Sequence, residues 1–251
     1  MPKMKPILFN TEMVKENLEG RKTATRRVVK PQPPASAQFI MGICSHGDYA
    51  FDDSIDNPGQ DDRRVYMAPY NPGDILYVRE TWSTKLSNEC IAQPCHTGWC
   101  PYESCESATG PCFPEDYIYK ATDNLPSYGG KWRPSIHMPR EAARIFLRVT
   151  DVRVEKLQES FFCNGATVRK LAAEGIDIGN QCRECIETYG SPCCIDAESE
   201  CGILDDVRDD FAKLWDSTIK PTDLSRYGWS ANPWVWVIEY KRITKEEAYG
   251  N

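Results

Sequence analysis

The chain has 251 residues, of which 41% are hydrophobic and 11% aromatic, and this suits one large globular domain or one domain with insertions. No apolar run reaches the roughly 18 residues of a membrane-spanning helix and no signal-peptide pattern opens the chain, so we expect a cytoplasmic protein. The formal net charge of −7 argues against a general nucleic-acid coat protein.

Charge is distributed unevenly along the chain. Residues 1–30 hold eight Lys and Arg against three Glu, a net charge of +5, whereas residues 174–216 carry a net charge of −9. A basic region on an acidic protein suits a small anionic or nucleotide-like ligand better than a long duplex.

The first predicted elements lead into a basic motif. An apolar run at 6–9 predicts a buried strand, and a helix is expected over 11–18, ended by Gly20. Residues 20–27 (the basic motif) then hold four cations and two hydroxyls, and we expect extended backbone over 24–29. Crowded like charges repel, so the motif indicates an anionic or polar ligand; a solvated basic turn is the alternative.

A second candidate region follows a turn at 72–74. Residues 30–62 are expected to form a loop or a weak hairpin, and a strand is predicted over 75–82. This strand ends in Arg79, Glu80 and Trp82, a combination that often lines a ligand pocket, with a surface salt bridge as the alternative.

Residues 132–139 are held extended by two prolines and concentrate polar and aromatic side chains. Trp132 could stack on a nucleobase, while Arg133, Ser135 or His137 could bond its edge. The alternative is a packing loop with a structural histidine. A long strand with a bulge or bend is then expected over 143–157, as barrels use to curve.

The last third of the chain predicts a helix over 167–174, an amphipathic helix over 204–215 and a closing strand over 232–240. Glu174 stands at the C-terminal end of the first helix, where the helix dipole disfavours a carboxylate. We therefore expect a functional carboxylate there, with a cation such as Lys22 as its partner.

Ten of the twelve cysteines fall into two clusters. Because disulfides are disfavoured in the cytoplasm, structural zinc is the leading interpretation, and reduced thiols or redox disulfides are the alternatives. The second cluster contains a C-x2-C pair, whereas the first has looser gaps and includes His96. The predicted ligands are Cys182, Cys185, Cys193, Cys194 and Cys201 in the second cluster, and Cys90, Cys95, Cys100, Cys105 and Cys112 in the first.

Four stretches together resemble the ASCH domain, a small β-barrel related to the PUA family of RNA-binding modules, and in particular the long ASCH proteins of phages and prophages. They are KPILFNTEMV, GRKTATRRV, GDILYVRETW and WRPSIHMPREAARIFLRVTDV. The resemblance implies an α+β fold, a PUA-like mixed β-barrel with flanking helices. It would form one domain over 1–251, with cysteine-rich insertions at 83–115 and 178–202, and a phage or prophage origin.

The resemblance also implies candidate site residues. Bacterial N4-acetylcytidine amidohydrolases, which are more distant relatives, use a Lys, a Thr and a Glu, and these match Lys22, Thr25 and Glu174. In such an enzyme Thr25 would attack an amide carbonyl and Lys22 would accept its proton.

A binding domain for RNA or a nucleotide is the favoured function. Here the basic-motif cations Arg21, Lys22, Arg26 and Arg27 would contact the ligand, while Trp82 or Trp132 would stack on a base. Hydrolysis of N-acylated nucleosides is the first alternative, and a zinc-stapled protein-interaction module is the second.

Overall fold

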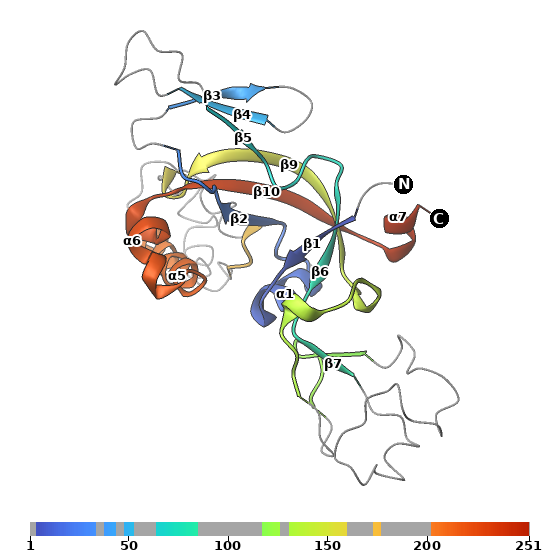
Figure 1. Cartoon of the computed structure of the whole chain (residues 1–251). Helices are drawn as coiled ribbons and strands as arrows, with labels where there is room; N and C mark the ends of the chain where they lie inside the picture. The colour runs from blue at the N-terminus through green and yellow to red at the C-terminus, as the bar shows by residue number, and fades with distance from the viewer. Residues whose placement is uncertain are drawn as a thin grey trace, which may run out of the picture. The chain divides into compact units, whose positions relative to one another are not determined.

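The computed structural model describes residues 4–33, 38–43, 48–52, 64–84, 117–125, 131–159, 173–176 and 202–250. In this part of the chain the fold is α+β, as predicted (Figure 1). None of its helices is long and apolar enough to cross a membrane.

The main sheet has five strands in the order β1-β6-β9-β10-β2. Strand β1 runs parallel to β6, and β2 runs antiparallel to β10. Among the described residues no pairing joins the two ends of this order into a closed barrel. The five strands are β1 (Met4–Leu8), β2 (Ala24–Val28), β6 (Ile75–Arg79), β9 (Phe146–Lys156) and β10 (Trp234–Ile243). A strand was predicted at each of these places, although the one predicted at β6 was too long.

The other described strands form two smaller sheets. Strands β3 (Gln38–Ile43), β4 (Asp48–Asp52) and β5 (Arg64–Met67) form an antiparallel sheet. Strands β3 and β4 lie within the region 30–62, where we predicted a loop or weak hairpin. Strands β7 (Trp82–Thr84) and β8 (Tyr117–Tyr119) form the second.

The prediction of one strand over 75–82 was wrong, because the strand is interrupted after Arg79. The backbone N–H of Glu80 donates to the Met138 sulfur atom at 3.2 Å instead of continuing the ladder of β6. The interruption leaves Glu80 buried, at 1% exposure.

Helix α1 (Thr11–Leu18) begins and ends as predicted. The side chain of Asn10 accepts the backbone N–H of Met13 at 2.8 Å, and Gly20 takes the left-handed conformation, with φ of 78°, that ends the helix.

Of the helix predicted over 167–174, residues 167–172 lie outside the described residues. Ala173 is helical, and Gly175 has φ of 87°.

Three helices lie near the C-terminus: α5 (Gly202–Ser217), α6 (Leu224–Tyr227) and α7 (Lys245–Tyr249). Helix α5 was predicted and α7 was not. Helix α7 begins with a capping box in which the Thr244 hydroxyl accepts the backbone N–H of Glu247, and the Glu247 carboxylate accepts that of Thr244.

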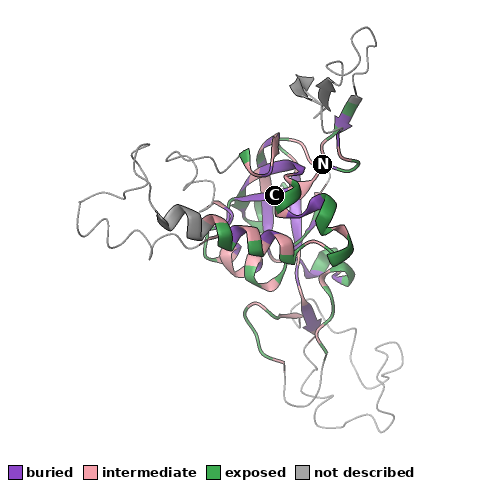
Figure 2. Ribbon diagram, turned by 90° about the vertical axis from the view of Figure 1, so that its left-hand side faces the viewer, coloured by how far each residue is buried: buried purple, intermediate pink, exposed green. Residues whose placement is uncertain are grey.

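The chain divides into two compact units. Unit 1 contains Met1–Leu18, Ile75–Leu147 and Ile243–Asn251, and unit 2 contains Glu19–Asp74 and Arg148–Arg242. Figure 2 shows buried residues concentrated on the strands and exposed ones on the outer faces of the helices. One domain over 1–251 stays a prediction. So do the two cysteine-rich insertions, because apart from Ser83, Thr84 and Gly202 their residues lie outside the described ones.

Each unit has a hydrophobic core of its own. The core of unit 1 gathers β6, β7 and the residues before β9, and it includes Ile75, Trp82, Met138, Ala142 and Phe146. The core of unit 2 packs α5 against β10 and the end of β9, and it is made of Leu157, Phe211, Trp215, Val235 and Val237.

Candidate functional site

Strand β2 carries the second half of the basic motif. Its residues pair with β10 in antiparallel register, with Thr25 opposite Ile238 and Arg27 opposite Trp236. Because side chains alternate along a strand, Thr25 and Arg27 lie on one face and Arg26 on the other. The Arg26 guanidinium lies 5.8 Å from the Phe211 ring centre, on the face that α5 covers.

The backbone of Thr23 fixes the first half of the motif. Its N–H donates to the Ala173 carbonyl at 2.8 Å, and its carbonyl accepts the N–H of Tyr240 at 2.9 Å. The residues on either side of these bonds, Lys22 and Glu174, are thereby placed against each other.

Lys22, Arg26 and Glu174 form a buried ion cluster. The Lys22 ammonium donates to Glu174 Oε2 at 2.7 Å and to the Glu174 backbone carbonyl at 2.9 Å. Arg26 donates to the other carboxylate oxygen, Oε1, at 2.5 Å. The side chains of Lys22, Arg26 and Glu174 are only 1%, 2% and 6% exposed. One carboxylate therefore holds two buried cations.

Burial and charge act in opposite directions on these groups. Burial lowers the pKa of Lys22, and Arg27 and Arg26 lower it further, so it stays below 10.5 although Glu174 raises it. Burial alone would raise the pKa of Glu174, but Lys22 and Arg26 outweigh that effect and hold it below 4.5. The carboxylate is therefore ionised at neutral pH, and the ammonium gives up its proton more readily than a lysine in water.

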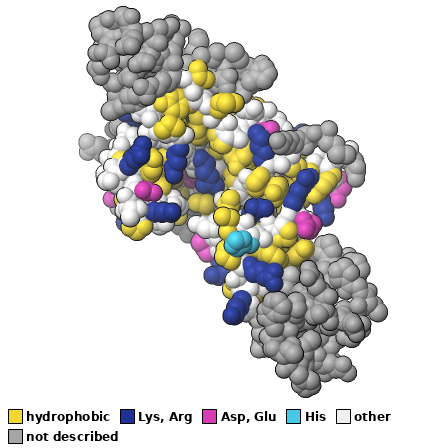
Figure 3. Space-filling view, viewed as in Figure 1, with side chains coloured by type: hydrophobic (Ala, Val, Ile, Leu, Met, Phe, Trp, Pro, Cys, Tyr) yellow, Lys and Arg dark blue, Asp and Glu magenta, His cyan; other side chains and the backbone are white. Residues whose placement is uncertain are grey.

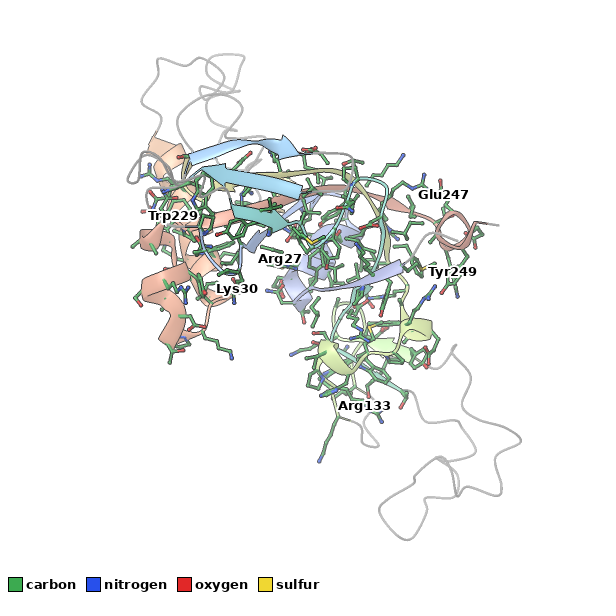
Figure 4. All side chains as sticks on the ribbon, turned by 45° about the horizontal axis from the view of Figure 1, so that its top comes forward. Arg27, Lys30, Arg133, Trp229, Glu247 and Tyr249 are labelled. Atoms are coloured by element: carbon green, nitrogen blue, oxygen red, sulfur yellow. The ribbon has the colours of Figure 1, made fainter. Side chains whose placement is uncertain are left out.

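Arg27 and two tyrosines lie near this cluster. Arg27 is half-buried, and burial lowers its pKa while Tyr70, Glu174 and Tyr240 raise it. Burial raises the pKa of Tyr70, and Arg27 opposes the rise. Figure 4 labels Arg27 and, two residues beyond the strand, Lys30.

Two predicted site residues of the basic motif, Thr25 and Arg21, take no part in the ion pairs of this cluster. Thr25 is 1% exposed, and its hydroxyl makes no hydrogen bond to another described residue. Arg21 lies at the surface, where it forms an ion pair with Glu19. The structure thus groups Lys22, Arg26 and Glu174, with Arg27 nearby, and leaves Arg21 outside.

The other predicted ligand-binding residues all belong to unit 1. They are Arg79, Glu80, Trp82, Trp132, Arg133, Ser135 and His137. The Glu80 carboxylate accepts two bonds from Arg144, at 2.9 and 3.0 Å, and Arg79 donates instead to the Ile136 carbonyl at 3.2 Å. Burial raises the pKa of Glu80, and Arg144 opposes the rise.

Sequence reasoning missed Arg144, Tyr119 and Tyr70. The Arg144 guanidinium lies 3.9 Å from the centre of the Tyr119 ring, and the Tyr119 hydroxyl donates to the Ala142 carbonyl at 2.7 Å. Arg144 stands directly before an apolar strand, which marks it as a half-buried arginine but does not name its partner. Only the turn after β6 brings Glu80 to it.

The ten cysteines predicted to bind zinc lie outside the described residues. In the described ranges no group of three or more His, Cys, Asp or Glu side chains could hold a metal ion.

Comparisons of the chain with protein-family models, with curated proteins and with solved structures gave no match.

Proposed function

We propose that this protein binds a nucleotide or nucleoside, free or within RNA, at the buried ion cluster of Lys22, Arg26 and Glu174, with Arg27 nearby. The observation that carries the proposal is that a single buried carboxylate is shared by two buried cations and lies within electrostatic range of a third. A cluster with more cations than carboxylates favours an incoming anion, because added negative charge offsets the repulsion among the cations.

A purely structural ion pair is the competing explanation. Burying charged groups costs several kcal/mol each, and a buried pair often stabilises a protein no more than apolar side chains of the same volume. Because a buried charged cluster adds little stability, its presence points to another role, and such clusters are frequent at functional sites, where the charged groups interact with a ligand. The basic motif, which supplies both cations to Glu174, supports the same interpretation.

The fold is consistent with this proposal. We propose that the α+β fold is the PUA-like barrel of an ASCH domain, as the four motif stretches suggest. Support comes from the placement of those motifs: KPILFNTEMV covers most of β1 and the start of α1, GRKTATRRV contains β2, and GDILYVRETW contains β6.

Isothermal titration of the full chain with cytidine and with cytidine 5′-monophosphate tests the proposal. We expect the monophosphate to bind more tightly, and Lys22→Met to weaken its binding by at least tenfold. Arg21→Ala is the matched control, because it removes an exposed cation from the same motif and should change the affinity less than twofold. Equal losses in both variants, or no binding by the wild type, would overturn the proposal.

A second candidate function is hydrolysis of an N-acylated nucleoside such as N4-acetylcytidine. The observation that favours it is the lowered pKa of Lys22, since a general base must be available as a neutral amine. A buried threonine, Thr25, stands three residues away in the chain.

The chemistry would run in two steps. The Thr25 oxygen attacks the acyl carbon while the Lys22 amine takes the hydroxyl proton; the C–N bond then breaks, and the Lys22 ammonium returns the proton to the leaving nitrogen. Water then hydrolyses the acyl–threonine ester, which releases the carboxylic acid and restores Thr25. Glu174 would orient the Lys22 amine throughout.

Acetate release from N4-acetylcytidine measures this activity. Turnover that disappears in both Lys22→Met and Thr25→Ala, but persists in Arg21→Ala, is the expected result. If the wild type binds cytidine 5′-monophosphate but releases no acetate, the hydrolase function is excluded and the binding function stands.

A further inference from the structure

A short segment of unit 1, residues 131–140 (the strap), is fixed along β6 and β7 by hydrogen bonds at several points. The backbones of Trp82 and Arg133 exchange two bonds, of 3.2 and 2.8 Å, and the Ser83 hydroxyl donates to the Lys131 carbonyl at 3.1 Å. Further along, Arg79 donates to the Ile136 carbonyl, and the Glu80 N–H to the Met138 sulfur. The strap is therefore a well-ordered part of the surface.

The strap presents cations that have no carboxylate partner among the described residues. Lys131, Arg133 and Arg140 are all exposed, and the strap's neighbour Glu141 is the nearest acid in the sequence. Figure 3 shows one face of the molecule, on which Lys and Arg side chains, coloured dark blue, lie beside hydrophobic ones, coloured yellow. On a protein of net charge −7, exposed cations without a carboxylate partner in the described part of the chain indicate a binding surface for an anionic partner.

Two of these cations are held in place by aromatic rings. The Arg133 guanidinium lies 5.0 Å from the Trp82 ring centre, and that of Arg140 lies 5.5 Å from the Tyr249 ring centre (Figure 4 labels Arg133 and Tyr249). Such a contact leaves N–H groups of the guanidinium available to phosphate oxygens, although one N–H of Arg140 donates to the Met4 sulfur atom at 3.2 Å. Because these contacts restrict the two side chains, binding loses less conformational entropy.

An aromatic side chain stands between the first two cations. Trp132 is half-exposed and makes no hydrogen bond or ring contact with another described residue. Cations that alternate with an available aromatic ring are the pattern by which proteins hold single strands, since the cations contact phosphates and the ring stacks on a base.

We infer that the strap is a binding surface for single-stranded nucleic acid, separate from the Lys22–Glu174 cluster. Lys131, Arg133 and Arg140 contact the phosphate backbone, and Trp132 stacks on a base. The inference goes beyond the proposed function, because it assigns nucleic-acid binding to a second surface, in unit 1, outside the Lys22–Glu174 cluster. An acidic protein segment would engage the same cations but would leave Trp132 without a stacking partner.

Fluorescence anisotropy with a labelled oligouridylate and the full chain tests the inference at several salt concentrations. We expect Lys131→Ala/Arg133→Ala to weaken binding at least tenfold. We also expect it to reduce the slope of log K against log salt concentration by about 1.4, since each lost phosphate contact on a single strand contributes about 0.7. Trp132→Ala should weaken binding by about tenfold.

The control variant Lys220→Ala/Lys245→Ala removes the same charge from exposed positions elsewhere and should change affinity less than twofold. Equal losses in the two double variants would overturn the inference, and so would competition by polyglutamate as effective as that by unlabelled RNA. If Lys131→Ala/Arg133→Ala does not fold, the single charge reversal Lys131→Glu replaces it. Oligouridylate binding that depends on the strap, without any binding of cytidine 5′-monophosphate, would uphold this inference while the proposed function fails.

Discussion

Glu174 is the residue on which the cluster of unit 2 depends. Its two carboxylate oxygens and its backbone carbonyl accept three hydrogen bonds from Lys22 and Arg26. A carboxylate that serves two buried cations is harder to replace than either cation, because its loss leaves both without a counter-charge.

We therefore predict that Glu174→Gln lowers the free energy of unfolding by about 3–5 kcal/mol, the range for breaking a buried pair by removing one partner. Urea denaturation measures the change. Glu19→Gln removes the carboxylate of the exposed pair with Arg21 and should cost under about 0.5 kcal/mol. Similar losses in the two variants would contradict the buried cluster.

The pKa values of Lys22 and Glu174 also predict how stability depends on pH. The pKa of Glu174 is lowered, so its contribution is present above 4.5 and is lost as the pH falls through the folded value. The pKa of Lys22 is lowered too, so between its folded value and 10.5 the unfolded chain binds more protons. Both effects make stability rise with pH.

The measurement is the difference in unfolding free energy between wild type and Lys22→Met from pH 3 to 9.5. We expect the alkaline part of the rise to be absent in the variant, which has no ammonium to deprotonate. A difference that stays constant above pH 7 would show that the burial of Lys22 does not lower its pKa.

At the scale of single residues, the sequence predicted the pairing of Lys22 with Glu174 but not the bond from Arg26. Glu174 was identified because a carboxylate at the end of a helix opposes the helix dipole, and a basic motif offered Lys22 as its partner. The second bond, from Arg26, depends on the face of β2 that α5 covers, and this follows from strand pairing across more than 200 residues. No local pattern contains that information.

At the scale of elements, the strands with apolar alternation or continuous apolar runs were predictable. Strand β10 is buried on both faces from Trp234 to Ile238, so its run of Trp, Val and Ile is distinctive. Strands β3 and β4 were predicted only as a possible weak hairpin, because they lie in a region rich in Asp, Gly and Asn, which favours loops.

The turn before β10 depends on a residue with an unusual backbone. Asn232 has a φ of 45° and a ψ of 56°, and its side-chain oxygen accepts the Gln158 N–H at 2.8 Å, just after β9 ends. Asparagine tolerates this left-handed conformation, whereas alanine is strained by about 1–2 kcal/mol.

We predict that Asn232→Ala lowers the free energy of unfolding by about 2–4 kcal/mol, since it adds this strain to the loss of a hydrogen bond. Asn232→Gly tolerates the left-handed backbone without strain, so it should lower the free energy of unfolding by only about 1–2 kcal/mol, which is the contribution of the lost hydrogen bond. Thermal denaturation of both variants separates the two effects. A glycine variant as unstable as the alanine variant would rule out backbone strain.

For the whole molecule, the two cysteine clusters remain the least explained part of the sequence. We propose that they bind structural zinc, and we predict at least about one zinc per chain by elemental analysis of protein purified without chelator. Cys182→Ser/Cys185→Ser should lower that content and the melting temperature together.

Cys44→Ser/Cys163→Ser is the control, because neither residue belongs to a cluster. A wild-type chain with less than half a zinc, or a content unchanged in Cys182→Ser/Cys185→Ser, would exclude the zinc interpretation. Disulfides would instead appear as thiols that alkylate only after reduction.

The cluster of unit 2 joins parts of the chain that are made at very different times. Glu174 is 152 residues beyond Lys22 and 148 beyond Arg26. At roughly 5–20 residues per second, a ribosome produces the carboxylate about 8–30 s after Lys22. Until then β2 also lacks its partner, because β10 is made later still. The basic motif must therefore stay hydrated through most of synthesis, and the buried ion cluster is among the last parts of the protein to assemble.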